Sequence, residues 1–199
     1  VRQALNMATD KNKIITEVLY GYGVESDSPI PSTKNGDGTK PDVEGAIAIL
    51  EKAGWVMASD GIMERKSGTG IQTLEFSIAT ADSPDLKQAA EILKKEWEKI
   101  GALVTIRIFE YGDFYQNVIA TRKYDALLFG ESIGKDLDLY AFWHSSQRNS
   151  PGLNVAMYVN SKVDKLLEEA RVTSESKDRE SIYSQFEKIM KDEVPAIFL

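Results

Sequence analysis

The sequence predicts an α/β fold in which a mainly parallel central sheet is flanked by helices. Residues 72–129 alternate strand-like and helix-like segments, the pattern of right-handed crossovers between parallel strands. The last strand-like segment, 124–129, is almost wholly apolar, which is typical of strands covered on both faces. With 199 residues, 42% of them hydrophobic and 28% charged, the chain can bury one sizeable core, so we expect a single domain.

Three helices are predicted in the first part of the chain. Residues 1–8 carry apolar side chains at helical spacing, and Asp10 is a suitable N-cap for a second helix that ends near Gly21. A third helix begins at Asp42. The stretch 26–41 contains several prolines and turn-forming residues, so we expect a loop there.

The central segment opens with a strand, because apolar residues recur with period two over 72–80. Ser83 and Pro84 then start a helix, with a hydroxyl at the N-cap and proline at the first helical position. Trp97 lies on the apolar stripe of this helix, so we expect it in the core. Further strands are predicted at 102–109 and 124–129, and further helices at 113–122, 161–171 and 177–191.

Composition and charge exclude several classes of function. Asp and Glu outnumber Lys and Arg by 31 to 24, and the net charge of −7 would repel the phosphates of nucleic acid. The absence of cysteine rules out disulfides, thiolate zinc sites, iron–sulfur clusters and a cysteine nucleophile. No apolar run approaches the roughly 20 residues that span a bilayer.

The sequence indicates no metal or cofactor site. Asn35, Asp37 and Thr39 resemble the start of a calcium-binding loop, but Lys40 stands where that loop requires glycine. His144 follows aromatic residues and has no second histidine or cysteine to complete a metal site. We therefore expect this histidine to be structural.

The segment after the third strand carries two patterns of chemical interest. Gly130-Glu-Ser-Ile-Gly134 matches the nucleophile elbow of serine hydrolases, with Ser132 as the nucleophile. The sole candidate base, His144, lies 12 positions downstream and no helix is expected directly after the serine, which disfavours a catalytic triad. Asp136 and Asp138 could share one face of an extended segment and bind a hard cation or an ammonium group, or they could be solvated.

Both ends of the sequence resemble the interior of a longer chain. Residues 1–8 read as the middle of a helix without an N-cap. Residues 194–199 are mostly apolar, whereas natural termini are usually polar and frayed. We therefore expect a domain excised from a longer protein.

Several segments in order resemble one known family. Val1-Arg-Gln-Ala-Leu-Asn-Met-Ala8, followed by Asp10-Lys-Asn-Lys-Ile-Ile15, is similar to a signature of the family 5 extracellular solute-binding proteins, the receptors of peptide-type ABC importers. Later segments that resemble family landmarks are Gly21-Tyr-Gly23 with Pro29-Ile-Pro31, and residues 46–55, 142–146, 154–158, 163–164 and 193–198. The resemblance covers essentially the whole chain.

The resemblance implies a type II periplasmic-binding-protein-like lobe, with residues 1–199 forming a single ligand-binding lobe of a two-lobe protein. In that family two lobes close around a solute, which is then passed to an ABC permease in the membrane. The implied partners are a peptide or another small solute, the permease and the N-terminal lobe of the same protein, with no cofactor and no enzymatic activity. The parent protein would lie outside the cytoplasm, in the periplasm or lipid-anchored at the outer face of the membrane.

The resemblance also implies that the loop after strand 124–129 faces the solute, in agreement with ligand binding at the carboxyl ends of parallel strands. Peptide-binding members carry an aromatic residue there and, three positions later, an aspartate that pairs with the peptide amino group. These positions fall on Glu131 and Gly134, and neither matches. Glu131, Lys135 or Asp136 would then hold a different charged group. The predicted ligand-binding residues are Glu131, Ser132, Ile133, Gly134, Lys135, Asp136 and Tyr140.

The solute itself stays open, because ligands in this family range over peptides, nickel chelates, haem and oligosaccharides. Two functions of other classes also stay open: a serine hydrolase that uses Ser132, and a protein-interaction module without a small ligand.

Overall fold

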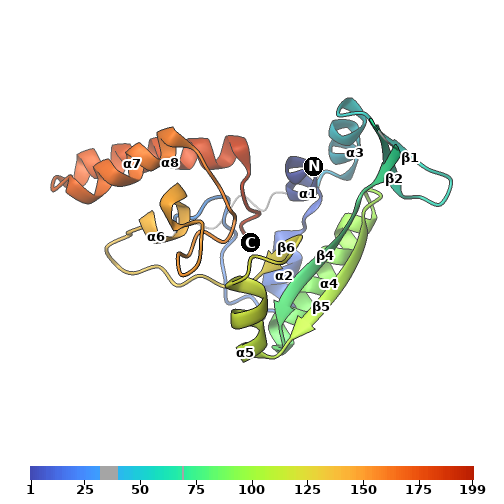
Figure 1. Ribbon diagram of the computed structural model, residues 1–199, viewed down its shortest axis with the longest axis horizontal. Coiled ribbons are helices and arrows are strands. Elements are labelled where there is room, and N and C mark those ends of the chain that lie inside the picture. Colours follow the sequence, from blue (N-terminus) through green and yellow to red (C-terminus); the bar gives the residue numbers. More distant parts are fainter. Residues whose placement is uncertain (32–39, 69) are drawn as a thin grey trace.

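A sheet part and a helical part lie side by side in the structure (Figure 1). The computed structural model describes residues 1–31, 40–68 and 70–199. We call residues 1–18, 40–68 and 70–128 the sheet part and residues 139–193 the helical part. The turn-forming residues 35–38 and the calcium-loop-like Asn35, Asp37 and Thr39 lie outside the described residues.

The sheet part begins with the three predicted helices, α1 (Arg2–Ala8), α2 (Lys11–Glu17) and α3 (Val43–Lys52). Asp10 caps α2 by accepting the Lys13 N–H at 2.9 Å, and Asp42 caps α3 by accepting the Gly45 N–H at 2.8 Å. The predicted cap at Asp10 and the predicted helix start at Asp42 are confirmed.

Three parallel strands form the sheet from which the candidate site emerges: β4 (Glu75–Ala81), β5 (Leu103–Phe109) and β6 (Ala126–Leu128). Their order is β5-β4-β6, and Ile78 of β4 pairs with Ile106 on one side and Ala126 on the other. The predicted parallel sheet is therefore confirmed. The expectation that segment 124–129 is covered on both faces is wrong, because β6 is a short, half-buried strand that pairs along one edge only among the described residues.

An antiparallel sheet precedes the parallel one and divides the predicted strand 72–80. It consists of β1 (Trp55–Met57), β2 (Met63–Ser67) and β3 (Gly70–Thr73) in that order. The division falls at Leu74, whose N–H donates to the carbonyl of Met63 at 2.8 Å. Residues before Leu74 pair with β2 and residues after it pair with β5. Pairing partners far apart in sequence decide this break, so periodicity could not show it.

Helix α4 (Pro84–Glu98) packs against the parallel sheet between β4 and β5. Trp97 is 5% exposed, as predicted for a core residue, and its indole N–H lies 3.1 Å from the Leu5 carbonyl and 3.0 Å from Thr9 Oγ1. The Ser83 side chain makes no capping hydrogen bond, contrary to prediction. Proline at the first helical position and Asp85 in the first turn still favour the start of the helix there.

A π-helical segment replaces the predicted helix at 113–122. The short helix α5 (Tyr111–Asp113) leads into η1 (Phe114–Ile119), which has π-helical hydrogen bonding. Phe114 and Val118 pack against the alanines at the carboxyl end of β4. That end of the sheet face is therefore covered.

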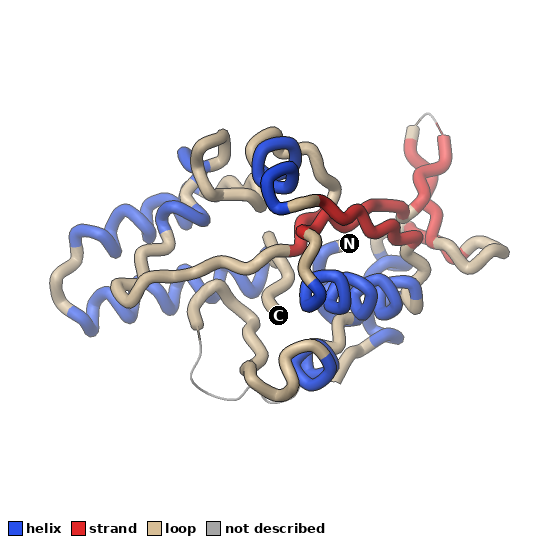
Figure 2. Tube along the Cα trace, turned by 90° about the horizontal axis from the view of Figure 1, so that it is seen from below, coloured by secondary structure: helices blue, strands red, loops and turns tan. Residues whose placement is uncertain are grey.

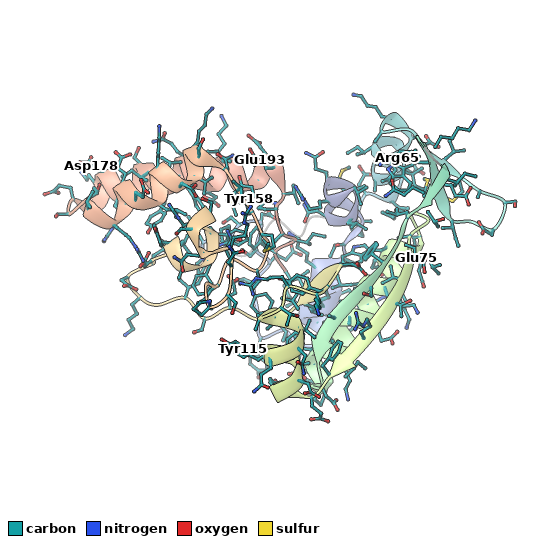
Figure 3. The ribbon with its side chains drawn as sticks, viewed as in Figure 1. Arg65, Glu75, Tyr115, Tyr158, Asp178 and Glu193 are labelled. Carbon is teal, nitrogen blue, oxygen red and sulfur yellow. The ribbon has the colours of Figure 1, made fainter. Side chains whose placement is uncertain are left out.

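The helical part has a core of its own. It contains α6 (Tyr140–Trp143), the 3-10 turn η2 (Ser145–Gln147), α7 (Ser161–Val172) and α8 (Ser176–Glu193). Trp143 and Phe186 lie within this core, and Tyr158 donates a hydrogen bond at 2.6 Å to Glu193 at the end of α8 (Figure 3). No helix of the described residues is both long and apolar enough to cross a membrane.

The C-terminal tail, residues 194–199, lies between the two parts. Ile197 and Leu199 pack against the core of the sheet part, whereas Ala196 and Phe198 pack against the core of the helical part. Arg2 of α1 donates to the Val194 carbonyl at 2.7 Å, next to the end of α8. The tail therefore joins two hydrophobic cores through alternating side chains.

Candidate functional site

The predicted solute-binding segment connects the two parts. Residues 129–139 leave the carboxyl end of β6 and run to α6 as a long loop (Figure 2). Phe129 packs at the covered end of the sheet, and Leu139 is fully buried in the helical part. Both ends of the segment are thus fixed, while most residues between them lie at the surface.

Glu131 is half-buried, and its carboxylate has no hydrogen-bond or ion-pair partner within the part of the chain that the structure describes. Burial raises the pKa of Glu131 to about 7, because desolvation disfavours the charged form. No cationic side chain among the described residues offsets that penalty. A positive group that approaches a carboxylate in such surroundings stabilises its charged form. Groups with strongly perturbed pKa values concentrate at functional sites.

The neighbours of Glu131 alternate in exposure. Ile133 is half-buried and packs against the helical core, whereas Ser132 and Gly134 are exposed. This period of two is that of an extended backbone, so Glu131 and Ile133 lie on the side that faces the protein. The chain then turns, with the Leu137 N–H donating to the Gly134 carbonyl at 3.0 Å.

Lys135 and Asp136 occupy the tip of that turn. Both are exposed, and neither forms an ion pair with the residues that the structure describes. They are therefore free to approach a solute, but solvent screens their charges, so each alone contributes less than a desolvated group would.

The structure separates Asp138 from Asp136. Arg171 of α7 donates two hydrogen bonds to the Asp138 carboxylate, from Nε to Oδ1 at 3.0 Å and from Nη2 to Oδ2 at 2.6 Å. The hydrogen bonds from Arg171 lower the pKa of Asp138. A cation or ammonium group shared by Asp136 and Asp138 would have to displace this arginine, so the pair does not form the predicted joint site. No group of three or more His, Cys, Asp or Glu side chains suited to a metal occurs among the described residues.

Both faces of the Tyr140 ring are occupied within the protein. The Arg171 guanidinium lies 3.8 Å from the ring centroid on one side, and the His144 ring stacks at 4.1 Å with an interplanar angle of 15°. A solute could reach only the edge and the hydroxyl of Tyr140. Its proposed part in binding is thereby limited to those atoms.

The geometry does not assemble the hydrolase triad considered from the sequence. His144 is buried, its Nδ1 lies 2.8 Å from Ser146 Oγ, and its Nε2 lies 3.3 Å from Glu168. The Ser146 N–H also donates to Nδ1, so His144 caps the turn η2. Ser132 lies in the exposed loop, with no hydrogen bond to His144 and no helix directly after it. The described residues give the hydrolase interpretation no support, because the serine and the only histidine of the sequence belong to separate local structures.

Sequence reasoning missed two exposed aromatic side chains at the same edge of the sheet. Tyr111 and Tyr115 follow the carboxyl end of β5, and both rings are exposed. Figure 3 shows Tyr115 at the outside of the short helix beside the sheet. Their spacing of four residues, with Phe114 and Val118 on the buried side, was the signal that could have revealed an exposed aromatic face.

Sequence reasoning also missed a polar hollow at the opposite end of the sheet, with a volume of about 460 Å³. Asp125 accepts hydrogen bonds there from the N–H and the hydroxyl of Ser77, at 2.9 and 2.7 Å, which lower its pKa. The hollow is wide open to solvent, and Asp125 is already satisfied. Since ligands of open parallel sheets bind at carboxyl ends, segment 131–136 remains the better candidate. The hollow is lined by Thr73, Glu75, Phe76, Ser77, Thr105 and Asp125.

Relatives of known function resemble the whole of this chain. A dipeptide- and tripeptide-binding protein of Pseudomonas aeruginosa is 31% identical over 199 residues, which cover 98% of this chain and 36% of that protein. The oligopeptide-binding protein AppA of Bacillus subtilis is 30% identical, over 100% of this chain and 38% of its own length. The chain therefore spans less than two fifths of these relatives.

Solved structures of solute-binding proteins also match the whole of this chain. AppA from Bacillus subtilis in complex with a nonapeptide matches with a TM-score of 0.87 at 27% identity, covering 100% of this chain and 40% of that one. NikZ from Campylobacter jejuni in complex with Ni(L-His) matches with a TM-score of 0.85 at 30% identity and the same coverage. The predicted periplasmic-binding-protein-like fold is confirmed.

The model of the "Bacterial extracellular solute-binding proteins, family 5 Middle" matches residues 1–154, well over half of the chain. Together with the relatives and the fold, this match shows that the chain belongs to the family 5 bacterial extracellular solute-binding proteins.

Proposed function

We propose that the chain is the solute-binding lobe of an ABC importer's receptor, which captures its solute by hinge closure and delivers it to a membrane permease. The observation that carries the proposal is the surface segment 131–136 at the carboxyl edge of a parallel sheet, with a half-buried carboxylate that lacks a partner among the described residues. In a chain of this family, a solute can supply that partner.

Residues 1–199 act as one lobe in this proposal, and the N-terminal lobe of the same protein supplies the other wall of the site. The tail that packs into both cores supports a single unit. The candidate residues lie on a surface, whereas a binding site typically encloses about 70–90% of its ligand. Glu131, Ser132, Ile133, Gly134, Lys135 and Asp136 form one wall, with the edge of Tyr140 beside them.

Peptides are the first solutes to test, because the relatives above are named for di-, tri- and oligopeptides. The parent protein works outside the cytoplasm, as its family does, and changes its solute in no chemical way. Lipid anchoring of the parent stays a prediction.

Calorimetric titration of the two-lobe parent and of this chain with the same peptides tests the proposal. We expect the parent to bind at least one peptide and the isolated chain to bind it at least tenfold more weakly, since half a cleft buries half the contacts. Equal affinities would overturn the two-lobe arrangement. Failure of the parent to bind any di-, tri- or oligopeptide would overturn a peptide receptor.

A further inference from the structure

The carboxyl end of the candidate solute-binding segment is held by α7 and α8, which lie side by side in the helical part (Figure 1). The Tyr183 hydroxyl of α8 donates a hydrogen bond to the Leu137 carbonyl, and Arg171 of α7 donates to both oxygens of Asp138. Residues 130–133 make no hydrogen bond with any residue that the structure describes. Within the described residues, the segment is thus hydrogen-bonded to other elements at its carboxyl end alone.

Leu137 adopts a backbone conformation that needs this support. Its φ of 53° lies in the left-handed region, which is sterically unfavourable for a residue with a branched side chain. Such a conformation persists where the surrounding contacts hold it. The hydrogen bond from Tyr183 and the full burial of Leu139 supply those contacts. The direction that the chain takes after its turn at Gly134 therefore depends on the helical part.

Arg171 makes two kinds of contact at once. Its guanidinium donates to Asp138 through Nε and Nη2, and it lies 3.8 Å from the centroid of the Tyr140 ring. The Tyr140 N–H in turn donates to Asp138 Oδ1 at 3.1 Å. A planar guanidinium can pair with a carboxylate at two points and stack on an aromatic ring, whereas an ammonium group cannot. One side chain of α7 thus fixes the last residues of the segment.

We propose that Arg171 and Tyr183 are positioning residues for solute binding, which hold segment 131–136 in the arrangement that receives the solute. The inference rests on the proposed function, because it concerns the same segment. It assigns α7 and α8, which lie outside the parallel sheet, a part in solute binding. A segment that is already ordered binds more tightly, because less conformational entropy is lost when the solute arrives.

Hydrogen exchange in the two-lobe parent without solute tests whether Arg171 holds the segment. Arg171→Met removes the hydrogen bonds to Asp138 and keeps an unbranched apolar side chain beside Tyr140. The amides of Leu137 and Tyr140 are hydrogen-bonded, so peptides that cover residues 134–141 report on this turn. We expect their exchange to become about fivefold faster or more, whereas exchange in α7, α8 and β4 should change less than about twofold.

Three further variants refine the measurement. Tyr183→Phe removes only the hydroxyl that donates to Leu137, so exchange of the same peptides should become about twofold to threefold faster. Arg171→Lys keeps the charge and should restore part of the protection, since an ammonium group pairs with Asp138 at one point only. Lys165→Met is the matched control, because it removes a positive charge from the exposed side of α7 and should behave as the parent does.

Calorimetric titration of the same variants with dialanine, trialanine and tetra-alanine tests whether this order matters to the solute. For the peptide that binds the parent most tightly, we expect Arg171→Met to weaken binding about tenfold, Arg171→Lys about threefold and Lys165→Met less than about twofold. Asp138→Asn should add less than about twofold to the loss in Arg171→Met, because both changes break the same contact.

The outcomes distinguish this inference from the proposed function. Weaker binding with unchanged exchange would show that Arg171 contacts the solute itself, and the positioning role would be wrong. Faster exchange of residues 134–141 with unchanged affinity, or faster exchange throughout α7 and α8, would also overturn that role while solute binding stands. If the parent binds none of the three peptides, the peptide receptor fails first, and this inference fails with it.

Discussion

The sheet part and the helical part are built in different ways, although each has its own core. In the sheet part, helices and strands alternate and bury continuous apolar faces, with Trp97 hydrogen-bonded across to α1. In the helical part, the apolar faces of α7 and α8 form the core, and polar side chains fix the loops onto it, such as Arg171 on Asp138 and Asn154, which donates to the His144 carbonyl. Regular periodicity builds both cores, and specific side-chain contacts order the loops of the second part.

Trp97 should be the most sensitive position of the sheet part. Trp97→Ala removes a buried ring and both hydrogen bonds to α1, so we expect a loss of about 3–5 kcal/mol in the free energy of unfolding. Urea denaturation measures it. A loss under about 1 kcal/mol would show that α4 does not anchor α1.

Phe198 tests whether the sheet part and the helical part open together or separately. Phe198→Ala removes a partly buried ring that contacts Trp143 at a centroid distance of 5.7 Å, and we expect a loss of about 2 kcal/mol. Hydrogen exchange should show increased opening of α7 and α8 with little change in β4 and β5. Equal opening of both parts would mean that the tail joins them into one cooperative unit.

Glu131, on the segment between the parts, should make the free energy of unfolding depend on pH. The pKa of Glu131 in the folded protein, about 7, lies above its usual value of 4.5, so the stabilising contribution of the protonated carboxyl is full below about 4.5 and is lost as the pH rises through 7. We expect about 1–2 kcal/mol in all, after allowing for solvent screening at a half-buried group. Unfolding of Glu131→Gln between pH 5 and 8 should lack this decline. An unchanged pH profile would contradict the raised pKa.

The smallest effect should come from Trp143 in the helical part. Its indole nitrogen is buried without a hydrogen-bond partner among the described residues, unlike that of Trp97. Trp143→Phe therefore removes an unsatisfied donor along with some packing, and we expect a change within about 1 kcal/mol. Trp97→Phe, which breaks two hydrogen bonds, should cost more. The reverse order would remove the contrast between the two tryptophans.

At the candidate site, sequence patterns predicted the position of the loop but not the contacts that its residues make. The loop after β6 could be predicted because a parallel strand and a family resemblance both indicate it. The hydrogen bonds from Arg171 to Asp138 could not be predicted, since the two residues lie 33 positions apart along the chain. The separation of Ser132 from His144 is of the same kind, because local spacing does not show which way a loop turns.

Sequence by itself determined most of the helices and the parallel strands, and it proposed the sheet edge at which the candidate site lies. Side-chain periods and caps such as Asp10 and Asp42 act within a few residues, so local sequence contains them. Tertiary structure alone decided the break at Leu74, the occupied faces of Tyr140 and the unpaired burial of Glu131. Each of these depends on groups brought together from distant positions, and desolvation arises only when such groups exclude water.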